Sequence, residues 1–181
     1  MRRAGWQLQA AATCLLLAAC AGAEFLLPAS DLEFELSGRI AVKYRDDAGV
    51  GNVSWRHSPQ GDEMLLTSPL GQGLARLVRA GGEITLTTQE GRDFRAADAE
   101  TLTEQVLGFR LPLAGLADWV RARPAPSPAP SALRRDAEGR LAELAQSGWT
   151  IEYQAYEGAR PSRLRLTYPG LELRLAISEW K

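Results

Sequence analysis

Few side chains in this sequence could carry covalent, acid–base or metal chemistry. The chain has one histidine, His57, and two cysteines, Cys14 and Cys20. A lone histidine cannot build a Cys/His metal cluster, so no metal site is expected. A base–nucleophile pair could come only from His57 with Ser54 or Ser58, and no phosphate-binding glycine loop or Gly-x-Ser-x-Gly element is present. His57 is expected as a solvated side chain at a strand end, which leaves the Cys20 thiol as the most informative group.

Cys20 ends the segment 17–20 (Leu-Ala-Ala-Cys), which closes a short apolar run over residues 8–19 that follows Arg2 and Arg3. This arrangement predicts a secretory signal peptide, and the run is too short for a good membrane span. Residues 17–20 resemble the processing site of bacterial lipoproteins, which implies a diacylglycerol on the Cys20 sulfur and an N-acyl chain on its amine. The alternative is an ordinary signal peptide cleaved near Ala23.

This processing site divides the chain into three predicted segments: a signal peptide at 1–19, a lipidated N-terminus and tether at 20–31, and a single domain at 32–181. The formal net charge of the whole chain is −1, and loss of Arg2 and Arg3 would make it −3. Such a charge does not favour nucleic-acid binding. Ala21 follows the cysteine where lipoproteins retained in the inner membrane carry aspartate, so the resemblance implies the outer membrane of a Gram-negative bacterium, with the domain facing the periplasm. A monomer is expected, with no cofactor besides the acyl chains on Cys20.

The rest of the chain alternates between apolar and polar residues with a period of two, which is typical of half-buried strands. Turn-forming residues separate the alternating segments, at 46–49, 59–62 and 169–170 for example. The pattern predicts a mainly β domain, a curled antiparallel up-and-down sheet of about ten to eleven strands. The predicted strands cover residues 34–44, 53–55, 64–67, 74–78, 84–86, 92–95, 140–146, 149–156, 164–168 and 171–177.

Two short helices interrupt the strands. Asp98 is a good N-cap for a helix over 99–107, and Gly108 is a typical stop residue. A second helix is predicted from Pro112 or Leu113 to a point before Pro124. The proline-rich stretch 124–130 then forms an extended loop back to the sheet rather than a binding motif, and the nearby Arg121, Arg123, Arg134 and Arg135 are expected as a solvated charged rim.

A sheet of this size must either close on a packed core or stay open and be covered. Periodicity alone leaves both possibilities: an apolar cavity under a helical lid, or a filled interior.

Several segments occur in a characteristic order: 38–42 (GRIAV), 53–55 (VSW), 65–71 (LLTSPLG), 111–119 (which starts Leu-Pro-Leu and ends in Trp), 148–153 (GWTIEY) and Trp180. Their order resembles the LolB family of outer-membrane lipoprotein receptors, over residues 32–181. The family implies an incomplete antiparallel barrel with a helical lid over an apolar cavity. It also implies a receptor that accepts triacylated lipoproteins from a LolA-like periplasmic carrier and inserts them among outer-membrane phospholipids.

The loop Pro69, Leu70, Gly71 should expose a large aliphatic side chain, and the resemblance implies that this leucine drives cargo into the bilayer. A leucine folded back onto the sheet is the alternative. Alternation places eleven residues on the concave, cavity-facing side: Ile40, Val42, Trp55, Leu66, Leu86, Trp149, Ile151, Leu164, Leu166, Leu173 and Leu175. A register error of one residue would reverse any strand. The predicted lid residues are Leu102, Val106, Leu116 and Trp119.

Two other functions are compatible with the sequence. One is a static lipid-binding or assembly lipoprotein that never hands cargo on. The other is a lipoprotein esterase that uses His57 with Ser54 or Ser58.

Overall fold

The structure is a computed structural model that describes residue 27 and residues 31–181. The signal peptide, Cys20 and Ala21 lie outside the described residues, and so does most of the tether. All eleven described strands belong to one antiparallel sheet. The strands are β1 (Phe34–Tyr44), β2 (Asp47–His57), β3 (Asp62–Thr67), β4 (Gly73–Ala80), β5 (Glu83–Thr88), β6 (Asp93–Ala96), β7 (Ala132–Arg135), β8 (Leu141–Gln146), β9 (Trp149–Glu157), β10 (Arg160–Tyr168) and β11 (Leu171–Trp180).

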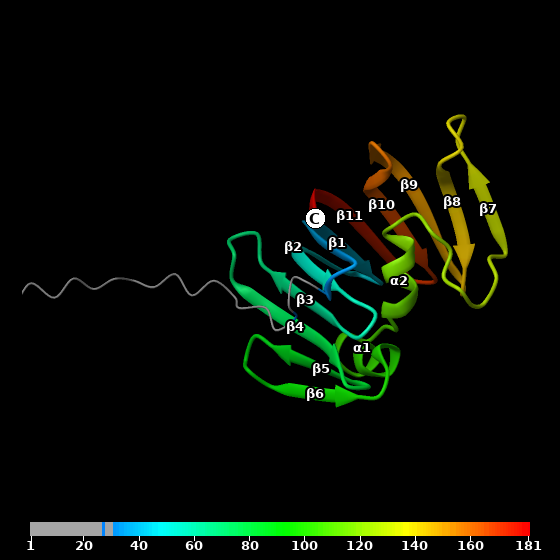
Figure 1. Ribbon diagram of the computed structural model, residues 1–181. Coiled ribbons are helices and arrows are strands. Elements are labelled where there is room, and N and C mark those ends of the chain that lie inside the picture. The colour runs from blue at the N-terminus through cyan, green and yellow to red at the C-terminus, as the bar shows by residue number, and fades with distance from the viewer. Residues whose placement is uncertain (1–26, 28–30) are drawn as a thin grey trace, which may run out of the picture.

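The first and last strands meet in the middle of this sheet. Its order is β6-β5-β4-β3-β2-β1-β11-β10-β9-β8-β7, so β6 and β7 are the two free edges (Figure 1). The chain therefore runs from the centre to one edge, crosses to the other edge, and returns to the centre. The predicted curled, up-and-down antiparallel sheet is confirmed, and it does not close into a barrel.

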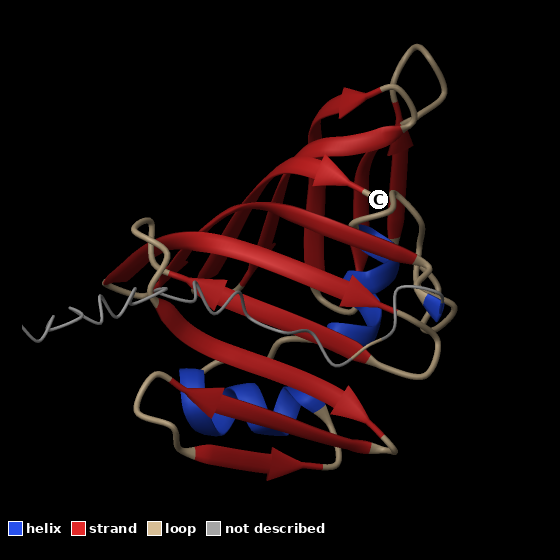
Figure 2. Ribbon diagram, turned by 60° about the vertical axis from the view of Figure 1, so that its left-hand side comes forward, coloured by secondary structure: helices blue, strands red, loops and turns tan. Residues whose placement is uncertain are grey.

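The sheet curls strongly, and its concave side holds the core (Figure 2). The pairing of β1 with β11 sets Ile40 opposite Leu175 and Val42 opposite Leu173, so apolar side chains from the two central strands form one inner layer. The side chains of the residues next to them along the strands, Arg39, Ala41 and Arg174, point to the outer, convex side of the sheet. Burial of each large aliphatic side chain contributes about 1.5–3 kcal/mol to folding.

The crossing between β6 and β7 contains both helices, α1 (Ala99–Leu107) and α2 (Leu113–Trp119). Asp98 accepts a hydrogen bond from the Thr101 amide, and Gly108 ends α1 in the left-handed conformation, so the predicted bounds of α1 are confirmed. Helix α1 lies beside β5 and β6, and α2 lies over the concave side of the sheet (Figure 1). No helix in the described part of the chain is long and apolar enough to cross a membrane.

Two local predictions need correction. The turn predicted at 46–49 is wrong, because Arg45 adopts a left-handed φ of 55° and closes a tight hairpin in which Tyr44 pairs with Asp47. Strand β7 lies where no alternation predicted a strand. All four of its side chains are exposed. A strand that buries neither face has no alternation of apolar and polar residues by which the sequence could predict it.

Candidate functional site

The concave side of the sheet encloses an apolar cavity beneath α2. Its volume is about 50 Å³, which leaves room for a few water molecules only. Residues from the central strands form its floor, and Leu111, Leu116 and Val120 cover it from the helical segment. The lining residues are Leu36, Ile40, Val53, Trp55, Met64, Leu111, Leu116, Val120, Leu166, Leu173 and Leu175. The cavity is apolar and small, so a guest the size of an acyl chain requires the helical segment to move.

All eleven residues predicted for the concave face belong to this core or pack against it. Eight are buried, and Ile40, Val42 and Leu66 are partly buried. Five of the eleven line the cavity itself: Ile40, Trp55, Leu166, Leu173 and Leu175. Leu86, Trp149, Ile151 and Leu164 fill the rest of the interior.

Sequence reasoning missed several lining residues. Leu36 and Val53 share the parity of Ile40 and Trp55 on their own strands, so extending the same alternation would have found them. Leu111 lies in the link between the two helices, where no period applies. Only the tertiary structure brings it over the cavity.

The predicted lid residues differ in what they contact. Leu116 faces the cavity, whereas Trp119 is fully buried against β8 and β9. The Trp119 indole N–H donates to Gln146 Oε1 at 2.8 Å, and the Tyr153 hydroxyl donates to the Trp119 carbonyl at 2.9 Å. Burial raises the pKa of Tyr153, which keeps its hydroxyl available as a donor. The end of α2 is therefore pinned to the sheet.

Helix α1 contributes the other two predicted lid residues. Leu102 is fully buried and Val106 partly buried, and both belong to the core rather than to the cavity lining. Leu107, at the end of the helix, is exposed. Helix α1 is thus a packed wall beside β5 and β6.

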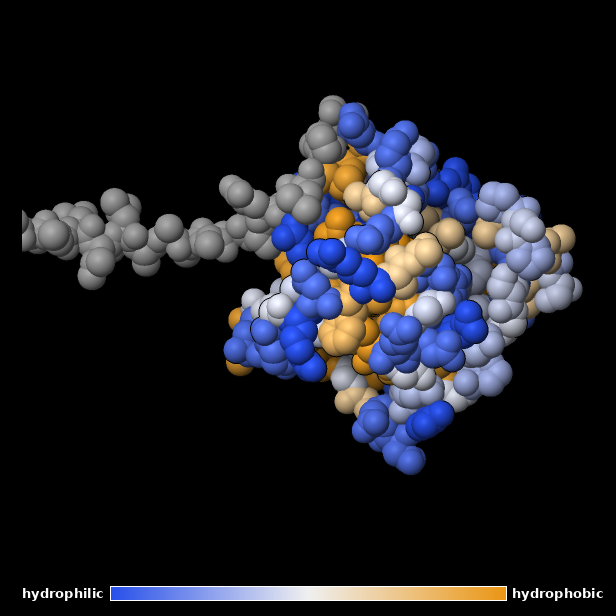
Figure 3. All heavy atoms as spheres, turned by 90° about the horizontal axis from the view of Figure 1, so that it is seen from below, coloured by the Kyte–Doolittle hydropathy of each residue, from blue (hydrophilic) through white to orange (hydrophobic). Residues whose placement is uncertain are grey.

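The link between α1 and α2 is held more weakly than the end of α2. The Tyr44 hydroxyl donates to the Gly108 carbonyl at 2.7 Å, and its ring contacts Phe109 with ring centroids 5.3 Å apart. The Leu111 amide donates to Thr103 Oγ1 at 2.9 Å. Figure 3 shows hydrophobic side chains exposed at the centre of the lower face, surrounded by hydrophilic ones. Tyr44 thus ties the link to the sheet by one hydrogen bond and one ring contact, whereas two hydrogen bonds tie Trp119 to β8 and β9.

Arg121 is not part of a solvated rim, and the expectation for this residue is wrong. Its guanidinium is half-buried and binds the Ala117 carbonyl, Asp118 and Glu33. The hydrogen bond from Arg121 lowers the pKa of the Glu33 carboxyl. Arg121 thus joins the end of α2 to the chain just before β1.

His57 is likewise not a solvated side chain. It is buried at the end of β2, with Nδ1 at 2.7 Å from Asp62 Oδ1. The same carboxylate accepts hydrogen bonds from Trp55 Nε1 at 2.9 Å and Arg79 Nε at 2.6 Å. Burial would raise the pKa of Asp62, but the hydrogen bonds from His57 and Arg79 outweigh it and hold the pKa below its usual value. The group is a hydrogen-bonded cluster that joins the ends of three strands.

The two serines near His57 do not complete a catalytic pair in the described part of the chain. Ser58 Oγ is hydrogen-bonded to the backbone of Gly61. Ser54 lies between the buried Val53 and Trp55, so its side chain lies on the opposite face of the sheet. The geometry gives no support to a Ser–His nucleophile.

The loop between β3 and β4 presents Leu70 to solvent. The Gly71 amide donates to the Ser68 carbonyl at 2.9 Å, Gly71 has a φ of 86°, and Leu70 at the tip is 97% exposed. The alternative of a leucine folded back onto the sheet is therefore wrong. Asn52 Nδ2 donates to the Ser68 carbonyl at 3.1 Å and ties the base of the loop to β2. The loop therefore holds Leu70 in an exposed position.

Comparisons with known proteins give consistent names. The family model described as "Outer membrane lipoprotein LolB" matches residues 32–180. A protein of Thiobacillus denitrificans named outer-membrane lipoprotein LolB is 42% identical over 81% of this chain and 78% of its own length. A protein of the same name from Chromobacterium violaceum is 35% identical over 92% of this chain and 94% of its own length. A solved LolA-superfamily protein from Nitrosomonas europaea aligns with 12% identity and a TM-score of 0.47, over 81% of this chain and 85% of that one.

Proposed function

Because this chain belongs to the LolB family of outer membrane lipoproteins, we propose that it accepts lipoproteins from a LolA-like carrier and delivers them to the outer membrane. In this proposal the acyl chains of the cargo enter the interior beneath α2. The protein itself is held at the outer membrane by acyl chains on Cys20, with the folded domain in the periplasm. Binding and release of the chains need no covalent chemistry.

The observation that carries the proposal is the apolar interior beneath α2 and the link that precedes it. Each methylene withdrawn from water is worth about 0.8 kcal/mol, so exposure of a dozen methylenes costs about 10 kcal/mol. An acyl chain therefore needs an apolar host during transfer. The lining of Leu36, Val53, Leu166 and their neighbours offers this surface and contains no charged side chain.

The small volume of the cavity supports a loading step that moves the cover. A volume of about 50 Å³ cannot hold an acyl chain, so the interior must expand when cargo enters. The end of α2 is pinned through Trp119 and Arg121, whereas the link at Gly108–Leu111 has fewer ties. We therefore place the opening at the link, where Leu111 can swing away from the cavity.

Release requires that the membrane hold the cargo better than the receptor does. A difference of about 1.4 kcal/mol between the binding free energies of the receptor and the membrane for the cargo gives a tenfold bias toward the membrane. The exposed Leu70 gives the receptor an apolar contact with the bilayer at the moment of release. This side chain lies outside the cavity, so acceptance and insertion depend on different residues.

A transfer assay tests the proposal. Carrier loaded with a labelled lipoprotein is mixed with this protein, and the two are separated and counted. The label should move to this protein, and then to added vesicles. If the label stays on the carrier, the protein is a static lipid-binding lipoprotein and the proposed function is wrong.

A further inference from the structure

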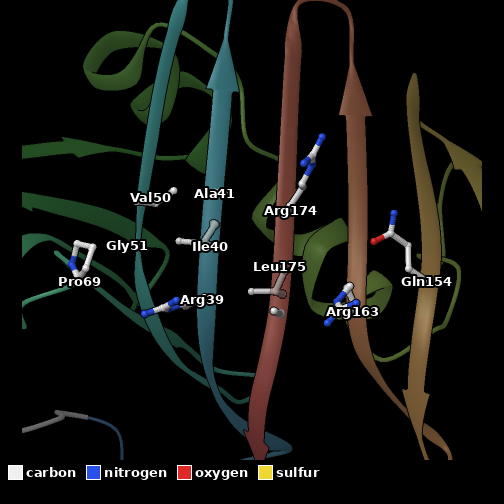
Figure 4. A pocket seen from close by; sticks show the side chains of 11 residues that line it. Arg39, Ile40, Ala41, Val50, Gly51, Pro69, Gln154, Arg163, Arg174 and Leu175 are labelled. Carbon is white, nitrogen blue, oxygen red and sulfur yellow. The ribbon is translucent and has the colours of Figure 1, made fainter.

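The outer face of the central strands carries a second, shallow depression next to the Leu70 loop. It has a volume of about 440 Å³ and lies on the opposite side of the sheet from the helices (Figure 4). Small side chains form its floor, namely Ala41 on β1 and Ala176 on β11. Both alternate with core residues along their strands, so they lie on the outer face of the sheet. Longer side chains surround this floor, among them Arg39, Arg163 and Arg174.

The strand register brings two of these arginines together around one alanine. Arg39 pairs with Ala176 from one side and Arg163 pairs with Ala176 from the other. Their backbones are therefore about 10 Å apart, two strand spacings, and Figure 4 shows them at the same level on either side of β11. Two guanidinium groups at this spacing can bind one phosphate between them.

Two of the three arginines that line this depression are not neutralised by an acidic side chain among the described residues. Arg174 is paired with Glu172 at 2.7 Å, and Arg165, one row along, has Glu152 and Glu172 within 4 Å. Arg39 and Arg163 are exposed and have no ion-pair partner among residue 27 and residues 31–181. The whole chain has a formal net charge of −1, so this local excess of positive charge is not a property of the whole surface.

The loop that carries Leu70 lies at the edge of this depression on the outer face of the sheet. Asn52, whose side chain holds the loop through Ser68, lies opposite Arg39 in the pairing of β1 with β2. Pro69 itself lines the depression. Gly51 permits this approach, since a Cβ there would lie 2.5 Å from the Thr67 carbonyl oxygen. The loop that exposes Leu70 therefore lies beside the depression that Arg39 and Arg163 line.

We propose that the outer face at Arg39, Arg163 and Ala176 docks on anionic phospholipid headgroups while Leu70 enters the bilayer. The phosphate of the lipid is the anion that the two guanidinium groups bind, and the apolar Val50 and Pro69 at the rim lie against the headgroup region. This inference rests on the proposed function for the role of Leu70, and it assigns the orientation of the domain at the membrane. Docking by this face leaves the helical side of the domain turned away from the bilayer.

Vesicle binding by the chain with Cys20→Ala tests the proposal, because no acyl anchor then contributes. Flotation is measured with phosphatidylcholine vesicles and with vesicles in which part of this lipid is replaced by phosphatidylglycerol. The Cys20→Ala parent should bind the anionic vesicles better than the phosphatidylcholine vesicles. Adding Arg39→Gln and Arg163→Gln should weaken binding to the anionic vesicles by roughly fivefold per arginine, about 25-fold together. The matched control, Arg95→Gln with Arg134→Gln, removes two exposed arginines elsewhere and should retain the preference.

Equal binding of the parent chain to both vesicle types would overturn the proposal, and so would an equal loss in the control. Acceptance of cargo from the carrier is measured on the same variants and should be unchanged. If the Arg39/Arg163 variant instead loses acceptance and keeps its vesicle binding, the face docks a protein and the proposal is wrong. If the parent chain fails to accept cargo from the carrier, the proposed function is wrong. The vesicle measurements would still decide whether this face docks on anionic lipid.

Discussion

The indole N–H of Trp119 donates a 2.8 Å hydrogen bond to the side-chain carbonyl of Gln146, and this bond ties the end of α2 to β8. Gln146 also accepts from the Ala125 amide and donates to the Ala125 carbonyl, so one buried side chain holds both the helix and the start of the proline-rich stretch. The cover of the cavity therefore has a fixed end at Trp119 and a lightly held link at Gly108.

Gln146→Leu should lower the free energy of unfolding by about 3 kcal/mol, because the buried Trp119 N–H and the backbone of Ala125 lose their partners. Urea unfolding followed by tryptophan fluorescence measures the change. Gln105→Leu, on the exposed side of α1, is the matched control and should stay within about 0.5 kcal/mol of the parent. A similar loss in both variants would show that the Gln146 bonds do not hold the cover.

Tyr44→Phe should speed the uptake of a fluorescent fatty acid, because the link at Gly108 loses its hydrogen bond to the sheet. The expected loss of stability is about 1 kcal/mol, and stopped-flow fluorescence gives the uptake rate. Tyr168→Phe changes an exposed tyrosine on β10 and provides the comparison. An unchanged uptake rate in Tyr44→Phe would place the opening elsewhere.

Leu70→Glu should block insertion of cargo into vesicles and leave both folding and acceptance from the carrier close to those of the parent. The side chain is 97% exposed and makes no contribution to the core, so only a contact outside the molecule can be lost. Leu133→Glu, at an exposed leucine of the edge strand β7, is the control that should insert normally. Normal insertion by Leu70→Glu would remove this loop from the mechanism.

Asp62 should make the domain sensitive to acid. Its pKa in the folded state lies below the ordinary value of 3.8, so its stabilising contribution is complete above that value and is lost as the pH falls through the lowered pKa. Asp62→Asn should therefore be less stable than the parent near neutral pH, and the difference should shrink below about pH 4. Thermal unfolding across this range measures it, with the exposed Asp46→Asn as control. A difference that is constant with pH would mean that ionisation of Asp62 is not the cause.

Local patterns in the sequence determined much of the fold. The two-residue period places all eleven residues predicted for the concave face on the side on which the core lies, because each strand must bury one face. Asp98 and Gly108 gave the bounds of α1, since capping depends on residues within one turn of the helix end. Pro69 and Gly71 likewise gave the turn that exposes Leu70.

Only the tertiary structure decided the features that depend on residues far apart in the chain. The pairing of β1 with β11 brings Arg39 and Arg163 to opposite sides of Ala176, and no local period carries that information. His57 on β2 is buried against Asp62 on β3, and Arg79 on β4 binds the same carboxylate. These partners lie on other strands, so the local sequence around His57 predicts a surface position instead. The opening between β6 and β7, and the small cavity beneath α2, result from how the whole sheet curls. Short-range sterics and solvation determine which face of each segment is buried, whereas long-range packing determines which buried faces meet.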